Sequence, residues 1–288
     1  MSNKSLIIEE RARDIGDFLV GRLLPFRKKR MVGPFIFIDH MGPSEVSPEK
    51  PFDVGPHPHI GLSTLTYLFS GEIFHRDGLG TEQRIVPGAV NWMSAGKGIA
   101  HSERTPEDLR HSKYTLHGYQ IWVALPKELE DMEPAFYHAR EEDLPSWKKG
   151  GLEYILVAGK AYNKTSPIPV HSELYMLNVK SVKAARWTPD ELYGETAICV
   201  VKGELKACGE TVKQGSLLVA KPGETCEIEI APQSHLLIFG GEPFTEKRHI
   251  FWNFVSSSKE TIDKAKENWK NHKFEEIPGE SGRIELPG

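Results

Sequence analysis

Short segments in which apolar and polar residues alternate, separated by glycine and proline, occupy most of the chain up to about residue 245. Side chains of a β-strand point alternately to opposite faces, so this alternation predicts half-buried strands. Turn residues recur about every eight to twelve positions, which is typical of a β-sandwich or β-barrel. We expect strands at residues 63–69, 72–76, 83–86, 89–93, 120–124, 154–158, 174–179, 197–201, 217–220 and 226–230.

A helical pattern is clear only near the C-terminus. Ser257 and Glu260 have the spacing of a capping box, which satisfies free amide groups at the start of a helix. Ile262, Ala265 and Trp269 follow at helical spacing. The sequence therefore predicts one short helix that packs an apolar stripe on the β-structure.

An internal repeat is visible. Residues 68–72 resemble residues 200–204, and residues 87–96 resemble residues 214–223, with two glycines at matching positions in each of the longer segments. A repeated turn pattern of this kind predicts two similar β-barrels in tandem.

The pattern breaks at 146–151, where we place the linker. We therefore expect an N-terminal barrel over residues 1–146 and a C-terminal barrel over residues 147–288, the latter followed by the short helix.

Two pairs of polar residues carry the candidate chemistry. His57 and His59 form one pair, and His101 and Glu103 form the other, each at spacing i, i+2. On a strand this spacing places both side chains of a pair on one face. Brought together inside a barrel, three imidazoles and one carboxylate form a transition-metal site with coordination positions left for a substrate.

The repeat predicts that only one barrel binds metal. Adding 127 residues to His101 and Glu103 leads to Ile228 and Ile230, which are apolar. We expect these isoleucines, alternating with Cys226, to line a buried face of a strand in a C-terminal barrel without metal.

Charge and cysteine content narrow the classes of function. The 288-residue chain has a net charge of −4, which argues against bulk attraction to nucleic acid or to an anionic membrane. Three cysteines without a CxxC pair predict a reducing compartment and no disulfide framework. The N-terminus contains acidic residues and no apolar stretch, so we expect no signal peptide and a cytoplasmic protein.

Longer motifs carry a resemblance to a known family. They occupy residues 39–43, 56–59, 67–68, 75–77, 91–103, 120–126 and 252–258. Over nearly the whole chain they resemble the pirin family of the cupin superfamily. The glutamate that most cupins have a few residues after the HxH pair is absent, because Ser63 and Thr64 stand there, and the carboxylate is Glu103 instead. Both departures are themselves pirin-like.

The resemblance implies two cupin barrels of the jelly-roll type, with one mononuclear iron in the N-terminal barrel. The positions that match the iron ligands of the family are His57, His59, His101 and Glu103. It implies one Fe(II) per chain, for which other divalent first-row metals can substitute. Several bacterial and eukaryotic pirins open the flavonol quercetin with O₂, and the mammalian member is a nuclear transcription co-regulator.

We therefore expect an oxidoreductase of the quercetin 2,3-dioxygenase type that takes a flavonol-like enolic substrate and O₂, with Glu103 as the base for the substrate hydroxyl. The alternative is an iron-dependent redox-sensing protein that binds a regulatory protein partner, and nothing in the sequence separates the two. A sugar-phosphate isomerase is less favoured, because no basic cluster adjoins the two pairs.

Other notable side chains have more ordinary interpretations. We expect structural roles for four histidines, His40, His75, His111 and His117, with a second role beside the metal or in the pocket wall open to His75. The candidate walls of a substrate pocket are Phe35, Phe37, Trp92 and Met93.

Overall fold

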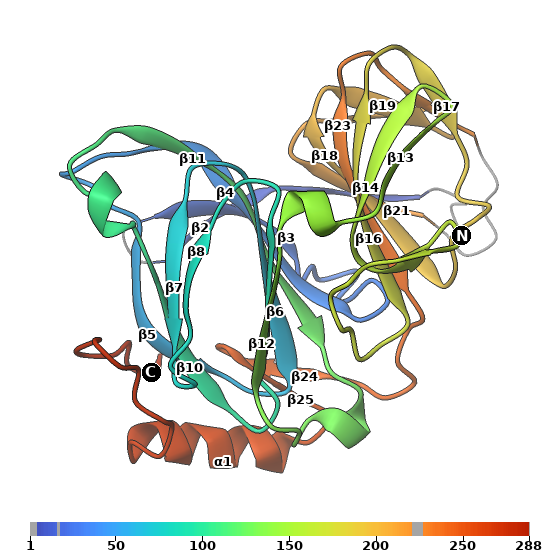
Figure 1. Ribbon diagram of the computed structural model, residues 1–288. Coiled ribbons are helices and arrows are strands. Elements are labelled where there is room, and N and C mark those ends of the chain that lie inside the picture. Colours follow the sequence, from blue (N-terminus) through green and yellow to red (C-terminus); the bar gives the residue numbers. More distant parts are fainter. Residues whose placement is uncertain (1–4, 16–17, 221–226, 288) are drawn as a thin grey trace. The chain divides into compact units, whose positions relative to one another are not determined.

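The computed structural model describes residues 5–15, 18–220 and 227–287. Two sheets form the N-terminal barrel (Figure 1), with strand orders β12-β9-β6-β11-β4-β3-β2 and β5-β10-β7-β8. The strands of the larger sheet are β2 (Arg11–Asp14), β3 (Leu19–Leu24), β4 (Phe35–Val46), β6 (Leu62–Ser70), β9 (Val90–Ser94), β11 (Tyr114–Ala124) and β12 (Ala135–Ala139). Those of the smaller sheet are β5 (Asp53–His59), β7 (Ile73–Asp77), β8 (Glu82–Ile85) and β10 (Ile99–Arg104).

The C-terminal barrel repeats this plan. Its larger sheet has the order β1-β21-β18-β23-β16-β14-β13, with β15 paired to β14, and its smaller sheet has the order β17-β22-β19-β20. The larger sheet contains β1 (Leu6–Glu9), β13 (Ser146–Lys149), β14 (Leu152–Ala161), β15 (Lys164–Thr165), β16 (Leu174–Ser181), β18 (Glu195–Lys202), β21 (Ser216–Val219) and β23 (His235–Gly241). The smaller contains β17 (Ala185–Trp187), β19 (Glu204–Ala207), β20 (Glu210–Lys213) and β22 (Ile228–Ile230).

Each barrel encloses an apolar core drawn from both of its sheets. In the N-terminal barrel, Leu68 and Leu116 of the larger sheet pack with Ile73 of the smaller. In the C-terminal barrel, Leu177 of the larger sheet packs with Ile230 of the smaller. Removal of this apolar surface from water is the main force that holds each pair of sheets together.

The expected strands are present. Residues 63–69, for example, lie in β6, and residues 197–201 lie in β18. The expected strand at 226–230 corresponds to β22, although Cys226 lies outside the described residues. The sequence predicts β-structure from the start of the chain but no bounds for β1 to β4, and the strand that it predicts for His57 and His59 is β5.

The contacts divide the chain into two units that are not contiguous in sequence. One comprises the described residues of Met1–Arg11, Gly21–Phe37 and Glu142–Phe244, and the other those of Ala12–Val20, Ile38–Glu141 and Thr245–Gly288. Strand β1 pairs with β21 and so completes a sheet of the C-terminal barrel. The N-terminal strand and the C-terminal segment therefore each belong with the barrel that is more distant in sequence.

The C-terminal helix forms as expected but packs elsewhere. Helix α1 (Lys259–Lys270) follows the hairpin β24 (His249–Phe251) and β25 (Phe254–Ser256), above which the N-terminal barrel lies in Figure 1. Its buried residues Ile262, Ala265 and Trp269 pack with Ile60 and Ala100 of the N-terminal barrel. The expectation that the helix accompanies the C-terminal barrel is wrong, because its apolar stripe has its complement on the N-terminal one.

The expected capping box also differs. The helix is capped by Ser258, whose side chain accepts a hydrogen bond from the amide of Thr261. Ser257 instead donates from its hydroxyl to the buried carboxylate of Glu130. The serine that the local pattern predicts as the cap therefore bonds to a residue distant in sequence instead.

The repeat is confirmed by backbone conformation. Gly71 and its counterpart Gly203 have φ values of 75° and 82°, and Gly88 and Gly215 have 79° and 77°. Only glycine adopts this left-handed region readily, so both barrels use the same turns at the same places.

The expectation of a chain without disulfides is wrong. Cys199 is buried and outside any disulfide, but Cys208 takes part in a disulfide bond. Cys208 is exposed in the turn between β19 and β20, and the spacing of the cysteines in the sequence does not reveal this. Among the described residues, no helix is long and apolar enough to cross a membrane.

Candidate metal centre

Strand pairing brings the two ligand pairs together. Strand β10 lies between β5 and β7, and in its antiparallel register with β5 His101 faces His57 while Ile99 faces His59. Strand β5 bulges opposite His101–Glu103, so that Glu103 is opposite Val54 of β5 and His75 of β7. Alternation along the three strands places the histidines and Glu103 on one face of the smaller sheet.

Three imidazoles converge. One ring nitrogen from each of His57, His59 and His101 lies within 4.8 Å of the other two. The Nε2 atoms of His59 and His101 are 3.1 Å apart. The three side chains are buried, with exposures of 7%, 1% and 1%. Such a group of nitrogen atoms is suited to hold a divalent transition metal.

Burial keeps these imidazoles in the form that binds metal. Desolvation lowers the pKa of His57 to about 4, against the smaller opposing effect of its bond to Gly55. Desolvation also lowers the pKa of His59 and of His101, with neighbouring histidines adding to the effect. Neutral imidazole is the metal-binding form, so the rings are ready as ligands near neutral pH.

Hydrogen bonds select the nitrogen that each ring presents. His57 Nδ1 donates to the carbonyl oxygen of Gly55 at 2.9 Å, which leaves its Nε2 as the lone-pair atom. His75 Nε2 donates to the carboxylate of Asp77 at 3.0 Å, and its Nδ1 lies 3.3 Å from Nδ1 of His101. A neutral His75 thus accepts from His101 Nδ1, and His101 directs an Nε2 lone pair to the cluster.

Hydrogen bonds to the backbone fix the carboxylate of Asp77, which bonds to His75. It is fully buried, and its Oδ1 accepts from the amides of Leu79 and Thr81 at 2.9 and 3.0 Å. The second role that the sequence left open for His75 is therefore a contact with His101.

Glu103 follows His101 by two residues on β10, and it is not part of the three-residue cluster. Its Oε1 accepts from the hydroxyl of Thr66 at 3.0 Å, and its side chain is buried. Desolvation raises the pKa of Glu103, with His75 and Thr66 acting in the opposite direction. Thr66 also lies 2.7 Å from Oε1 of Gln120, so the larger sheet supplies polar contacts to the site.

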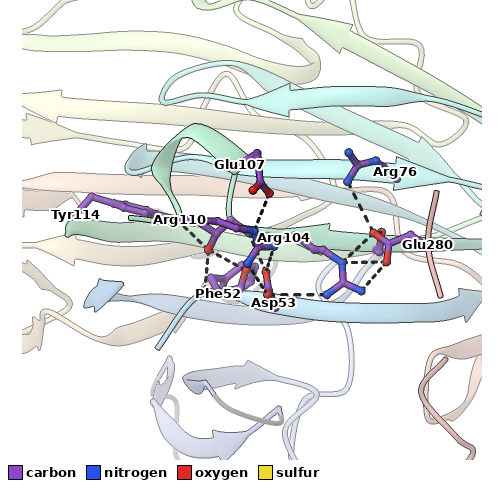
Figure 2. A network of polar contacts seen from close by, with 10 residues as sticks. Phe52, Asp53, Arg76, Arg104, Glu107, Arg110, Tyr114 and Glu280 are labelled. Atoms are coloured by element: carbon purple, nitrogen blue, oxygen red, sulfur yellow. Dashed lines mark hydrogen bonds and ion pairs between the residues drawn. The ribbon is translucent and has the colours of Figure 1, made fainter. Parts of the chain in front are cut away.

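The opposite face of β10 is clamped by the C-terminal segment. Glu280 accepts from Ser102 at 2.9 Å and from the guanidinium of Arg104, whose Nε lies 2.8 Å from Oε1. Figure 2 shows Arg104 between Glu280 and Asp53, with Arg76 also directed at Glu280. Ser102 and Arg104, which alternate with His101 and Glu103, thus hold β10 in place from the outer face of its sheet through their bonds to Glu280.

The four expected pocket walls lie in different surroundings. Phe35 packs on Phe239 of the C-terminal barrel, with ring centroids 4.9 Å apart, and Phe37 lies against Arg22. Trp92 points to the other face of β9 from Met93, and Met93 packs with Phe136. Met93 lies on the inner face, because it faces Phe136 across the strands and the ring centroid of Phe136 is 4.7 Å from that of His75.

The other histidines are not among the cluster. His40 and His117 form a pair with Nε2 atoms 2.9 Å apart, and His111 is exposed. The sequence analysis predicted no role at the site for Thr66 or Asp77. The alternation of β6 and β7 places both on inward faces, but only once the strands of the site are known.

Family models and relatives agree with this arrangement. Residues 18–123 match the model described as Pirin, and residues 176–275 match the model described as Pirin C-terminal cupin domain. A pirin-like protein of Caulobacter vibrioides is 44% identical over 285 residues, covering 98% of this chain and 95% of the relative. The chain belongs to the pirin family. Its all-β architecture is accordingly that of two cupin domains.

Solved structures of pirin type extend the comparison. A quercetin 2,3-dioxygenase from Acinetobacter baumannii superposes with a TM-score of 0.90 at 34% identity, covering 99% of this chain and 95% of that one. A bacterial pirin from Escherichia coli in complex with nickel(II) has a TM-score of 0.65 at 21% identity, covering 84% of this chain and all of its own, which shows a shared fold.

Proposed function

We propose that this pirin-family protein is a metal-dependent dioxygenase that opens flavonols such as quercetin with O₂. The observation that carries the proposal is the buried group of His57, His59 and His101, with Glu103 next to it, in a chain that resembles a crystallised quercetin 2,3-dioxygenase along 99% of its length. The substrate is a planar enolic aromatic compound, and O₂ is the second reactant.

The residues fit a first-row divalent metal. Nitrogen lone pairs from three neutral imidazoles and one carboxylate oxygen make a donor set that suits Fe(II). Cys199, a buried cysteine outside any disulfide, belongs to the C-terminal barrel and offers no competing ligand. We propose one Fe(II) per chain, held by His57, His59, His101 and Glu103, with nickel and other divalent metals able to substitute.

Glu103 has a second role in the proposal. A metal bound at this site lowers the pKa of a coordinated hydroxyl and so favours the ionised form of an enolic substrate. Glu103 takes the hydroxyl proton on the oxygen that does not bind the metal, and the hydrogen bond from Thr66 orients its carboxylate. Asp77, the other buried carboxylate nearby, is engaged by His75 and two backbone amides. Burial of the site keeps water from competing for the ionised substrate.

A turnover assay tests the proposal. The protein is loaded with Fe(II) without oxygen, its metal content is measured, and O₂ consumption is then followed with a panel of flavonols. We expect O₂ uptake and ring opening with quercetin by wild type, and neither by metal-depleted protein. Absence of flavonol oxidation by fully loaded protein, under conditions where a family member is active, would instead favour an iron-dependent regulatory protein that binds a protein partner.

A further inference from the structure

A row of polar side chains crosses the inner face of the larger sheet in the N-terminal barrel. In the antiparallel registers, His138 of β12 faces Asn91 of β9, Asn91 faces Thr66 of β6, and Thr66 faces Gln120 of β11. Residues paired directly across strands point to the same side of a sheet. The four side chains therefore lie at one level on one face.

This face is the one that looks at the metal centre. Thr66 contacts Glu103 directly, at 3.0 Å between Oγ1 and Oε1. Phe136 and Trp122 lie two positions from His138 and Gln120 on their strands, and so on the same face. The ring of Phe136 contacts that of His75, and the ring of Trp122 contacts that of His59, with centroids 4.7 and 5.1 Å apart. The row thus extends along the side of the histidine group, from Gln120 on β11 to His138 on β12. His138 is exposed, because β12 is the edge strand of the sheet.

Asn91 in this row has a buried donor without a partner. The residue is 3% exposed, and its Oδ1 is bonded to Nδ1 of His138 at 2.9 Å. Its Nδ2 has no hydrogen-bond partner. Buried amide groups are nearly always paired, because an unpaired one loses its hydration without compensation. A donor left open on this inner face, on the residue paired with Thr66, which itself contacts Glu103, is complementary to an acceptor oxygen of a ligand.

We propose that Asn91 is a specificity-determining residue that donates a hydrogen bond from Nδ2 to a carbonyl oxygen of the substrate. This inference rests on the proposed function and deepens it. The ligand class is a planar compound that carries a carbonyl next to its enolic hydroxyl, as a flavonol does. A flavan-3-ol has the hydroxyl without the neighbouring carbonyl and leaves the donor unpaired, so Asn91 selects against it.

Binding without turnover tests this role. Metal-loaded protein is titrated anaerobically with quercetin and with the flavan-3-ol catechin, and quenching of tryptophan fluorescence gives each Kd. For Asn91→Leu, which has a similar volume and no donor, we expect about a three- to tenfold weaker Kd for quercetin. The Kd for catechin should change less than about twofold, because that ligand makes no bond to Asn91. Asn91→Asp keeps the shape and the bond to His138, and it should lose quercetin affinity at least as strongly.

A matched control comes from the other barrel. Asn178 of β16 is also buried and bonded to a histidine, His235, on the strand face opposite the core residues Leu177 and Val179. Asn178→Leu should leave both Kd values as in wild type, and melting curves and metal content show whether each variant is folded and loaded. Equal quercetin binding by wild type and both Asn91 variants overturns the role of Asn91 alone. No binding of any flavonol by loaded wild type overturns the proposed function together with it.

Discussion

Single hydrogen bonds decide how the imidazoles of the centre are presented. The carboxylate of Asp77 can only accept from His75 Nε2, so in a neutral His75 the Nδ1 atom is the acceptor that faces His101. Residues outside the ligand set therefore determine which nitrogen of His101 carries the lone pair. Such contacts around metal ligands commonly set both ring orientation and metal affinity.

Asp77→Asn tests this chain of contacts. An asparagine that keeps its oxygen toward the amides of Leu79 and Thr81 turns its NH₂ to His75, which reverses the donor at His75 and then at His101. We expect metal affinity to fall about 10- to 100-fold, measured by competition with a chelating dye. Asp53→Asn, a carboxylate of the same sheet that pairs with Arg110, is the control and should bind metal normally. Unchanged affinity in Asp77→Asn contradicts the assignment.

Glu103→Gln separates the two roles proposed for this residue. Glutamine keeps an oxygen donor for metal and removes the charge that accepts a proton. At equal metal content, we expect turnover of flavonol to fall by about 10²–10⁴ and to recover in part at higher pH, where the substrate is already ionised. A mild loss with no pH recovery would show that Glu103 acts as a ligand alone.

At the scale of elements, strand β10 is held from both sides of its sheet. Its inward residues form the centre, while Ser102 and Arg104 on the outer face are bound by Glu280 of the C-terminal segment. The same segment is tied to β5, since the amide of Ile284 donates to the carbonyl of Pro56 at 2.8 Å. The C-terminal segment thus restrains the two strands that carry His57, His59, His101 and Glu103.

Removal of the Glu280 charge should loosen this restraint. The side chain is 5% exposed, so we expect Glu280→Gln to lower the free energy of unfolding by about 1–3 kcal/mol at pH 7. Urea unfolding followed by tryptophan fluorescence measures the effect. Glu285→Gln is the matched control, because Glu285 is 75% exposed in its pair with Arg283 and should change stability little.

The same variant makes a pH prediction. Arg104, followed by Ser102, holds the pKa of Glu280 below its ordinary value. A lowered carboxyl pKa in the folded state adds stability that is complete above the unfolded pKa of about 4.3 and is lost as pH falls through the folded pKa. The stability difference between wild type and Glu280→Gln should therefore be constant from pH 7 to pH 5 and narrow below about pH 4. A difference that does not change in acid would rule out the ion pair as its source.

At the scale of the molecule, one barrel plan is used twice with different contents. His101 of β10 corresponds to Ile228 of β22. Ile228 and Ile230 are buried in the apolar core of the C-terminal barrel, as expected from the repeat. Strand geometry therefore supplies the same inward positions in both barrels, and side-chain identity decides between a histidine group suited to metal and a packed apolar core.

The repeat-related pair His101→Ala and Ile228→Ala should have opposite effects. His101→Ala should lose metal and keep the barrel folded. Ile228→Ala should retain metal and lose about 2–5 kcal/mol of stability by leaving a cavity. Metal content per chain and thermal unfolding measure both, and wild type should hold close to one metal ion. A ratio near two, with the second ion in the C-terminal barrel, would contradict this division.

Much of the candidate site follows from sequence alone, for a physical reason. The two-residue period of a strand places His57 with His59, and His101 with Glu103, whatever the rest of the fold does. Glycines at matching turns, such as Gly71 and Gly203, made the duplication visible because the left-handed backbone requires glycine there.

Only the tertiary structure determines the contacts between segments that are distant in sequence. The contact of His75 with His101, the polar row through Asn91 and the clamp by Glu280 all join residues whose spacing in the chain carries no periodic signal. The same holds for helix α1, which a local pattern predicts but whose packing partner it does not name. Side-chain period is a local property of the backbone, whereas register and packing are set by the burial of complementary surfaces far apart in sequence.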